Sequence, residues 1–546
     1  MQQTPKQIKS EERSMMGAMI LVLIVLFCFQ YFSRPSTPVP ETTEPVVVTE
    51  PEVPQKQITS QLPKHASSAV KIDTPALSGQ LSSAGGMLTS LTLNKYKETI
   101  AEDSTDVELL SDQYEAYLLW QGNVELPTED TPWHVQGSTL TPENPIVMTW
   151  NNGAVALTRT IRVDEHYMFT FEDMLENKSG KDISVLLNGV IARAVDNVPD
   201  TRSSVHTGFV AVADDRLREE AYDKVEKGPI AYSSVGGWTG MTDKYWQTIL
   251  IPDQRAQVEF MNKQEQNVYF STFKTKAEVV PAHGKIVKTT HIFAGAKNLN
   301  LINGYQKELN IPKFDLTIDF GWFYFLTKPF LYFLQWLYAL VGNMGIAILV
   351  FATLLRLALL PVATKSYISM AKMKKIQPQM KLLQERYKDD RMRLQQEMMA
   401  LYKREKVNPA GGCLPMLIQI PVFFALYKVL SVSLQMRQAP FFGWIKDLSA
   451  PDPSSVFTLF GLVPWPIPSF LNLGVMPILM GLTMYIQQRM SPQPAGADKA
   501  QMNMFKYMPI IFTFMMGQFA VGLIIYWTWS NILSIAQQKY IMKKVG

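Results

Sequence analysis

The stretch NMGIAILVFATLLRLALLPVAT, residues 343–364, decides how the rest of the chain is organised. It predicts a membrane-spanning helix, because between its polar ends every residue except Thr353 and Arg356 is apolar, Gly or Pro. A guanidinium within a span costs at least about 2.5 kcal/mol on insertion scales, so Arg356 is a candidate functional residue. The alternative is that its long stem carries the charge to the membrane surface near Lys365. This helix alone leaves both interpretations open.

The overall composition limits the class of protein. The chain has 546 residues, enough for several domains, of which 47% are hydrophobic and 18% charged. Its net charge of +4 is modest, and we expect no specific nucleic-acid sequence as a partner. The two cysteines, Cys28 and Cys413, lie far apart, and the histidines show no metal-ligand spacing. We therefore expect neither a metal nor a cofactor.

The N-terminal segment predicts a membrane anchor followed by a linker. Residues 15–32 form an almost entirely apolar run with basic residues ahead of it and no small-residue cleavage pattern after it. We expect residues 1–34 to be an uncleaved anchor with the N-terminus in the cytoplasm. Residues 35–63 are rich in Pro, Thr, Glu and Val, which is typical of an extended linker, here on the outer side of the membrane.

Residues 64–316 predict a large β-sandwich outside the membrane. Aromatic side chains recur at every second position over residues 167–171, as in a half-buried strand. Asn151-Asn152-Gly153 lies between two apolar runs and predicts a β-hairpin, and residues 177–180 separate a further pair of strands. A single span after a cytoplasmic N-terminus places this domain on the far side of the membrane.

Residues 317–342 are apolar and dense in aromatic side chains, and Lys328-Pro329 interrupts them. Joined to the next helix they would be too long for one span. Because Trp and Tyr favour the headgroup level of a membrane, we expect an interfacial amphipathic helix on the outer leaflet.

Residues 365–406 predict a cytoplasmic hairpin of two amphipathic helices. Lys and Arg exceed Asp and Glu by seven in this short segment, which places it inside by the positive-inside rule. Its apolar face is rich in methionine. Packing of one helix on the other explains such a face, and a pliable surface for varied apolar client segments is the alternative. The candidate client-contacting residues are Met370, Met373, Met380, Met398 and Met399.

Four more apolar segments follow, at residues 414–432, 473–486, 504–519 and 523–536. With the anchor and the 343–364 helix they make six predicted transmembrane helices, five of them in a core over residues 343–546. Basic residues after the fourth span and near the C-terminus place both in the cytoplasm. Residues 456–471 are apolar but contain three prolines, so we expect an outer loop that dips into the interface.

Polar side chains occur throughout these short spans. Any one of them can simply hold helices together, but as a group they could line a water-filled cavity. No acidic residue lies within the predicted spans, which argues against an ion-coupled transporter. An unpaired Arg356 would instead attract a transient anion, either a lipid phosphate or the carboxylates of a passing peptide. The candidates for the cavity lining include Gln419, Ser431, Thr513 and Ser530.

Several motifs in residues 320–541 resemble those of the YidC family of membrane protein insertases in its Gram-negative bacterial form. Besides the Arg356 helix they include Ser369-Met370-Ala371-Lys372-Met373, Val407-Asn408-Pro409, Gln419-Ile420-Pro421, Trp444-Ile445-Lys446-Asp447-Leu448 and Met508-Pro509. Residues 64–316 match more loosely, through Gly236-Gly237-Trp238.

The resemblance implies an α-helical polytopic membrane protein with a large periplasmic β-supersandwich. It also implies five core helices around a hydrophilic groove that opens to the cytoplasm and to lipid. The groove arginine corresponds to Arg356, and the client-contacting aromatic pair to Tyr526 and Trp527. Trp527 departs from the Tyr of better-known members. A groove threonine falls at Ala352, so its part either passes to Thr353 or is lost.

We therefore expect a multi-pass insertase of the bacterial inner membrane, not an enzyme. The expected partners are nascent membrane proteins, the ribosome, the SecYEG/SecDF translocon and membrane lipids. Arg356 would stabilise the acidic tail of a client at reduced dielectric. The client's apolar segment would then move into lipid, driven by its burial at roughly 25 cal/mol per Å².

Two rival functions remain open from the sequence. The groove also suits a channel or a lipid scramblase. The predicted sandwich resembles sugar mutarotase folds, so carbohydrate binding or processing is possible as well, although fold does not give function. Sugar chemistry would need a convergent His/Glu pair, for which the candidates are His134, His166, His206 and Glu172.

Overall fold

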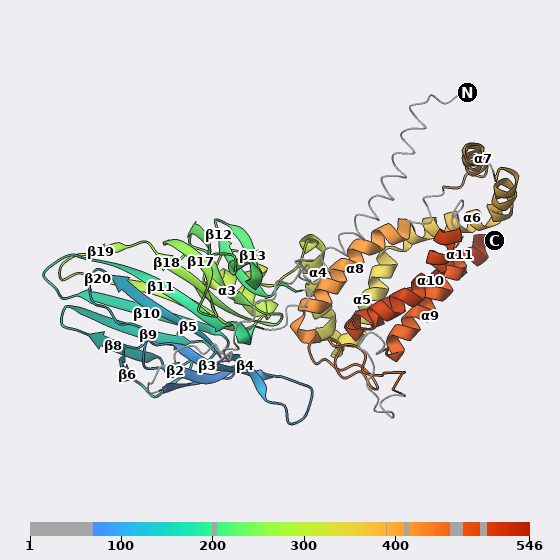
Figure 1. Ribbon diagram of the computed structural model, residues 1–546. Helices are drawn as coiled ribbons and strands as arrows, with labels where there is room; N and C mark the ends of the chain where they lie inside the picture. Colours follow the sequence, from blue (N-terminus) through green and yellow to red (C-terminus); the bar gives the residue numbers. More distant parts are fainter. Residues whose placement is uncertain are drawn as a thin grey trace, which may run out of the picture.

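A β-sandwich and a helical half lie side by side in the computed structural model (Figure 1). The structure describes residues 69–198, 205–388, 390–408, 414–458, 473–491 and 499–545. The predicted anchor and linker, and most of the outer loop at 456–471, lie outside these residues.

Two largely antiparallel sheets form the sandwich in the described part of the chain. The first has 11 strands, in the order β14 (Ile230–Val235), β17 (Gln257–Glu265), β18 (Val268–Thr275), β11 (Ile183–Ala194), β5 (Tyr114–Gly122), β3 (Leu88–Lys97), β2 (Leu77–Ser82), β1 (Ala69–Asp73) and β7 (Thr139–Leu140), with β19 (Glu278–Val280) beside β11 and β4 (Asp106–Leu110) beside β3. The second has nine, in the order β13 (Arg216–Glu220), β12 (Gly208–Ala213), β15 (Trp238–Thr242), β16 (Trp246–Ile251), β20 (Lys285–Ala296), β10 (Met168–Asn177), β9 (Val155–Val163), β8 (Ile146–Asn151) and β6 (His134–Gln136).

The predicted strand and hairpin signals are confirmed, with one difference in how two strands are joined. Strands β8 and β9 pair on either side of Gly153, where the Asn152 side chain accepts hydrogen bonds from the next backbone N–H groups. Residues 177–180 also separate two strands, but β10 and β11 lie in different sheets. The Asn177 amide holds this crossing by donating to the carbonyls of Val280 and Pro281. Sequence periodicity shows that strands exist, not which sheet they join.

A buried ion pair bridges the two sheets. On β9 and β10, Arg159 and Asp173 are each only 1% exposed and form a bidentate pair with two N–O distances of 2.7 Å. From the opposite sheet, Trp120 on β5 donates its indole N–H to the same carboxylate at 2.8 Å. The fourth partner is the carbonyl of Gly85, 3.1 Å from Arg159 Nη1. Because every charge is matched inside the core, removing one member leaves the others uncompensated.

Short helices connect the sandwich to the helical half. The sandwich carries η1 (Val195–Asn197) and α2 (Tyr222–Val225), and α3 (Leu299–Glu308) and η2 (Phe314–Thr317) follow its last strand. The helical half consists of α4 (Tyr324–Val341), α5 (Met344–Ala358), α6 (Leu360–Arg386), α7 (Arg391–Arg404), α8 (Leu414–Val432), η4 (Leu434–Met436), α9 (Val475–Met490), α10 (Lys499–Met516) and α11 (Val521–Val545).

The predicted single helix at 343–364 is wrong. Helix α5 ends at Ala358, and α6 begins at Leu360 with a bend of 67° between them. Pro361 lies in the first turn of α6, where its missing N–H is tolerated but a continuous helix is not favoured. By length and composition, none of the described helices could cross a membrane alone, whereas the bent α5–α6 pair could. The six-helix count therefore stays a prediction.

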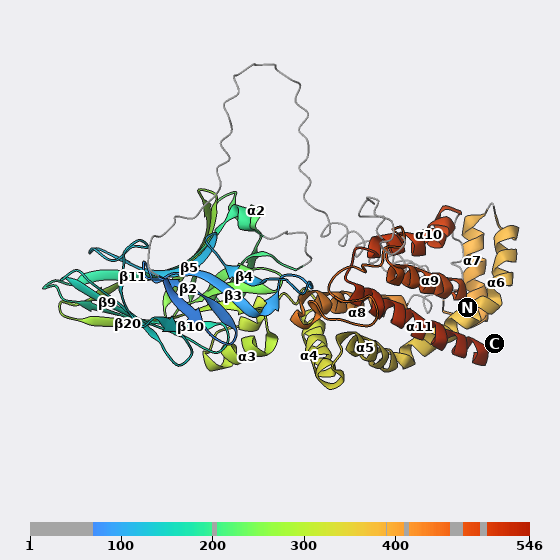
Figure 2. The ribbon, with the colours of Figure 1, turned by 90° about the horizontal axis from the view of Figure 1, so that it is seen from below.

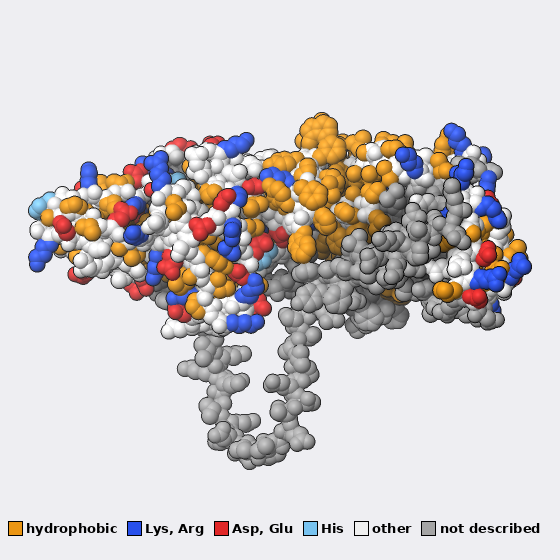
Figure 3. Space-filling model, turned by 90° about the horizontal axis from the view of Figure 1, so that it is seen from above, with side chains coloured by type: hydrophobic (Ala, Val, Ile, Leu, Met, Phe, Trp, Pro, Cys, Tyr) orange, Lys and Arg blue, Asp and Glu red, His pale blue; other side chains and the backbone are white. Residues whose placement is uncertain are grey.

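The helical half has an apolar surface between two polar ends. Helices α4 and α8 lie beside the sandwich, and the α6–α7 hairpin lies at the opposite end in both ribbon views (Figures 1 and 2). Hydrophobic side chains gather in a belt over the helical half, whereas Lys and Arg mark the hairpin end (Figure 3). Helix α4 buries Leu331 and Leu334 and exposes Phe325 (72%) and Trp336 (55%). A surface of this kind suits contact with lipid.

We predict that Asp173→Ala lowers the free energy of unfolding of the sandwich by about 3–5 kcal/mol, because it leaves Arg159 buried without its carboxylate. Thermal unfolding of the full chain, followed by tryptophan fluorescence, measures the change. The control is Glu172→Ala at the neighbouring position, which breaks the exposed Arg162–Glu172 pair and should cost less than about 1 kcal/mol. Equal losses in the two variants would contradict this view of the core.

Candidate substrate groove

Arg356 lies in the last turn of α5, directly before the bend into α6. Its Nη2 donates to the backbone carbonyl of Ser530 on α11 at 3.1 Å. Its Nε is buried and has no hydrogen-bond partner among the described residues. A cation at a helix C-terminus is favoured by the helix dipole, but only by about 0.3–1 kcal/mol. The guanidinium therefore keeps donor capacity for a further acceptor.

Polar side chains from three helices meet around this arginine. Gln419 on α8 donates to the hydroxyl of Tyr526 on α11 at 2.9 Å. The indole N–H of Trp529 on α11 donates to Thr353 Oγ1 at 2.9 Å, and that hydroxyl donates in turn to the Leu349 carbonyl. These bonds join α5, α8 and α11 near Arg356. We define the candidate groove as Arg356, Thr353, Gln419, Tyr526 and Ser530.

The candidate groove contains a cation but no anion. Helices α5, α8, α9, α10 and α11 contain no Asp or Glu. No ion pair to Arg356 occurs among the residues that the structure describes. Such a site can attract a carboxylate or phosphate at close range, where the reduced dielectric strengthens the attraction. It contains no nucleophile and base in contact that would indicate covalent chemistry.

Three further residues of the predicted groove make contacts that do not include Arg356. Ser431 donates to the Tyr427 carbonyl near the end of α8. Thr513 lies at the α9–α10 contact, where a Cβ on Gly481 would come within 1.9 Å of its hydroxyl. Trp527 packs against Phe423 and Phe512, with ring centroids 4.6 and 5.9 Å away. No hydrogen bond or ring contact within the described ranges joins these three residues to Arg356.

The hairpin methionines divide into buried and exposed positions. Met380 and Met398 are buried between α6 and α7, and Met373 is half-buried against the same cluster. Met370 instead packs with Tyr367 and with Ile541 of α11. Met399 is 38% exposed. Packing of one helix on the other therefore accounts for Met380 and Met398, and Met399 is the predicted client-contacting residue that the surface presents.

Lys428 was missed from the sequence. It lies in the outer half of α8, the end nearest the sandwich, and pairs with Asp319 at 2.5 Å. The signal was present, because a lysine inside the apolar run 414–432 is a functional candidate by the same argument that singled out Arg356.

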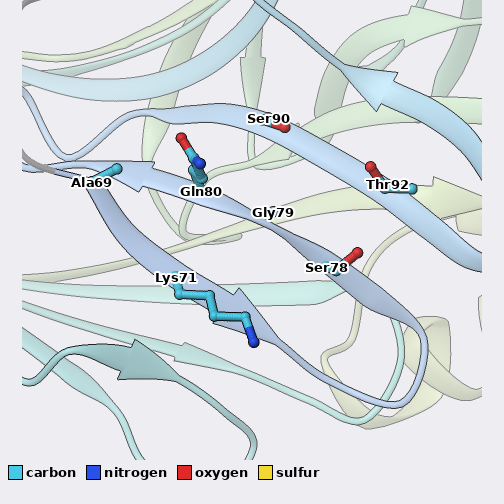
Figure 4. Close-up of a pocket in the computed structure, with 7 residues that line it drawn as sticks. All are labelled: Ala69, Lys71, Ser78, Gly79, Gln80, Ser90 and Thr92. Atoms are coloured by element: carbon cyan, nitrogen blue, oxygen red, sulfur yellow. The ribbon is translucent and has the colours of Figure 1, made fainter.

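The candidates for sugar chemistry do not form a site with one another. Glu172 pairs with Arg162 at 3.1 Å, and the His206 ring contacts the Phe209 carbonyl. A hollow of about 400 Å³ on the sandwich, drawn in Figure 4, contains none of the four candidates and is lined by Ala69, Lys71, Ser78, Gly79, Gln80, Ser90 and Thr92. Within the described residues, no group of His, Cys, Asp and Glu could hold a metal ion.

Comparisons with known proteins match both halves of the chain. Residues 336–546 match the family model described as 60Kd inner membrane protein, and residues 69–333 match the model of the YidC periplasmic domain. The "Membrane protein insertase YidC" of Beijerinckia indica is 45% identical over 91% of this chain and 85% of its own. The protein of the same name from Rickettsia bellii is 42% identical over 97% of this chain and 98% of its own length. A solved structure of an active YidC insertase is 19% identical, covering 86% of this chain and 91% of its own, with a TM-score of 0.37.

We predict that Met380→Ala lowers the local stability of the hairpin by about 2 kcal/mol or more, because it leaves a cavity between α6 and α7. Hydrogen exchange of the α7 amides in the full chain measures this. Met399→Ala, at an exposed position, should change the stability by no more than about 0.5 kcal/mol. Equally fast α7 exchange in both variants would show that Met399 also belongs to the packed face.

Proposed function

Because the chain belongs to the YidC family of membrane protein insertases, we propose that it moves client helices into the inner membrane through the candidate groove around Arg356. The chain is an insertase and not an enzyme, as the names of its relatives indicate. The observation that carries the proposal is the Arg356 guanidinium, which has one backbone acceptor and a buried Nε without a partner in the described structure.

We place the sandwich and the hairpin end of the helical half on opposite sides of an inner membrane. The basic hairpin and the Lys543-Lys544 end of α11 support a cytoplasmic position for that end, by the positive-inside rule. The sandwich would then lie in the periplasm, with residues 35–63 linking it to an anchor at 1–34. Residues 64–316, 317–342 and 343–546 are the proposed sandwich, interfacial helix and insertase core, with six transmembrane helices in all.

Insertion would proceed in two steps. A nascent client helix first docks on the hairpin at residues 365–406, whose exposed face includes Met399. Its short acidic tail then enters the candidate groove, where Arg356 supplies the positive charge and Gln419 and Tyr526 supply hydrogen bonds. Helix α5 has 15 residues, about 22 Å at helical rise, so the membrane beside it would be thinned. Burial of the client's apolar segment in lipid drives the transfer.

The proposed partners follow from the surfaces. Nascent membrane proteins are the clients, and the basic hairpin is the part of the chain that would face the ribosome. The apolar belt of Figure 3 would contact membrane lipids and the SecYEG/SecDF translocon.

We predict that Arg356→Ala slows the insertion of an acidic-tailed client by tenfold or more, since about 1.4 kcal/mol of lost attraction corresponds to a factor of 10. Arg356→Lys should retain most of the rate because it keeps the charge. Insertion into proteoliposomes, scored by protection of the client tail from protease, measures both.

The matched control is a client whose tail carries Asn and Gln in place of Asp and Glu. It should insert at the same rate with Arg356→Ala as with the unaltered chain. Lys446→Ala, at an exposed lysine between η4 and α9 that belongs to neither the hairpin nor the candidate groove, should leave both clients unaffected. Normal insertion of the acidic client by Arg356→Ala would contradict the electrostatic role.

A further inference from the structure

The Asp319 carboxylate joins three parts of the molecule. It pairs with Lys428 of α8 at 2.5 Å, and both side chains are 15% exposed. The same carboxylate accepts from the backbone N–H of His206 in the sandwich at 2.8 Å and from the N–H of Gly321, just before α4, at 3.1 Å. It therefore connects the sandwich, the start of α4 and the outer half of α8.

The surroundings of Asp319 favour its charged form and fix the lysine. Burial alone would raise the pKa of Asp319, but Lys428 and the N–H of His206 outweigh burial and hold that pKa below its usual value. Gly321 has a φ of +68°, and a Cβ there would come within 3.3 Å of Lys428 Cε. The lysine stem thus lies directly over this glycine, which holds a backbone conformation that other residues rarely adopt.

A second contact joins the two halves just past the end of α8. The Arg437 guanidinium lies over the Trp246 ring of the sandwich, 5.2 Å from its centroid. It also donates to the backbone carbonyls of Lys97 and Glu98, and the Gln438 amide donates to the Lys97 carbonyl at 2.9 Å. Lys428 and Arg437 therefore hold the outer end of α8 and the turn after it against the sandwich.

Helix α8 carries this constraint toward the candidate groove. Gln419, which bonds Tyr526, and Phe423, which packs on Trp527, lie on the same helix as Lys428. A shift of α8 would move Phe423 together with Lys428, because both follow Pro421 in the same helix. Gln419 precedes that proline, which removes one hydrogen bond of the helix but leaves α8 continuous from Leu414 to Val432, so the shift would also reach the contact with Tyr526.

We propose that the Asp319–Lys428 pair, with the Arg437 contact beside it, mounts α8 on the sandwich and so positions the α8 side of the candidate groove. Lys428 is a positioning residue in this view and does not touch the client. The effect of this pair on insertion rests on the proposed function of the groove, whereas the attachment of α8 to the sandwich does not.

Hydrogen exchange of the full chain in lipid nanodiscs tests the mounting. Lys428→Met and Asp319→Asn should each speed exchange of the outer α8 amides by about tenfold or more, because each leaves one charge buried without its partner. In the double variant, the increase in the exchange rate of these amides should be smaller than the product of the two single-variant increases, because no unpaired charge is left. Lys428→Arg should restore slow exchange, and strands β10 and β20 should be unaffected throughout. The control, Lys446→Met, makes the same substitution at an exposed lysine between η4 and α9.

Insertion assays on the same variants test the positioning role. Lys428→Met should slow insertion several-fold for acidic and neutral clients alike, which distinguishes it from Arg356→Ala. Unchanged α8 exchange in Lys428→Met would overturn the mounting, and faster exchange with unchanged insertion would overturn the positioning role. Both outcomes are independent of whether Arg356→Ala affects insertion, so failure of the groove proposal would be seen separately.

Discussion

The helical half depends on a positive charge that has no carboxylate to balance it. Helices α5, α8, α9, α10 and α11 contain no Asp or Glu, yet Arg356 lies where α5, α8 and α11 meet. A guanidinium in hydrocarbon is costly, and its one backbone acceptor does not replace a hydration shell. Arg356 therefore requires water, or a passing anion, beside it. The bend at Leu359 supports that requirement, because it ends α5 directly past Arg356 and keeps the apolar helix short.

Arg356 and Lys428 are similar residues whose roles differ because their partners differ. Both are single cations in apolar helices, and each would be costly if left alone. Lys428 is matched by Asp319 and by the turn at Gly321, so its role is to fix one element against another. Arg356 has donor capacity left over, which is what binding a transient partner needs. The fully paired cation thus lies near the sandwich, and the incompletely satisfied one lies toward the hairpin.

Local patterns predicted much of this fold. The alternation at residues 167–171, the Asn-Asn-Gly turn and the basic hairpin each follow from short-range physics, and the structure contains all three elements. What failed depends on distant contacts. The crossing from β10 to β11 is fixed by carbonyls of residues 280 and 281. Which of the hairpin methionines are buried depends on how α7 packs against α6, and the partner of Lys428 lies 109 residues earlier in the chain. The helix break, by contrast, has a local signal in Pro361, which lies in the first turn of α6.

The most direct test of the account is the access of water to position 356. In a chain with Cys28 and Cys413 replaced by Ser, Arg356→Cys can be treated with a positively charged, membrane-impermeant methanethiosulfonate from either side of oriented vesicles. We predict modification from the hairpin side only, with recovery of acidic-client insertion as the positive charge returns. A cysteine that reacts from neither side would show a dry helix contact and contradict the account.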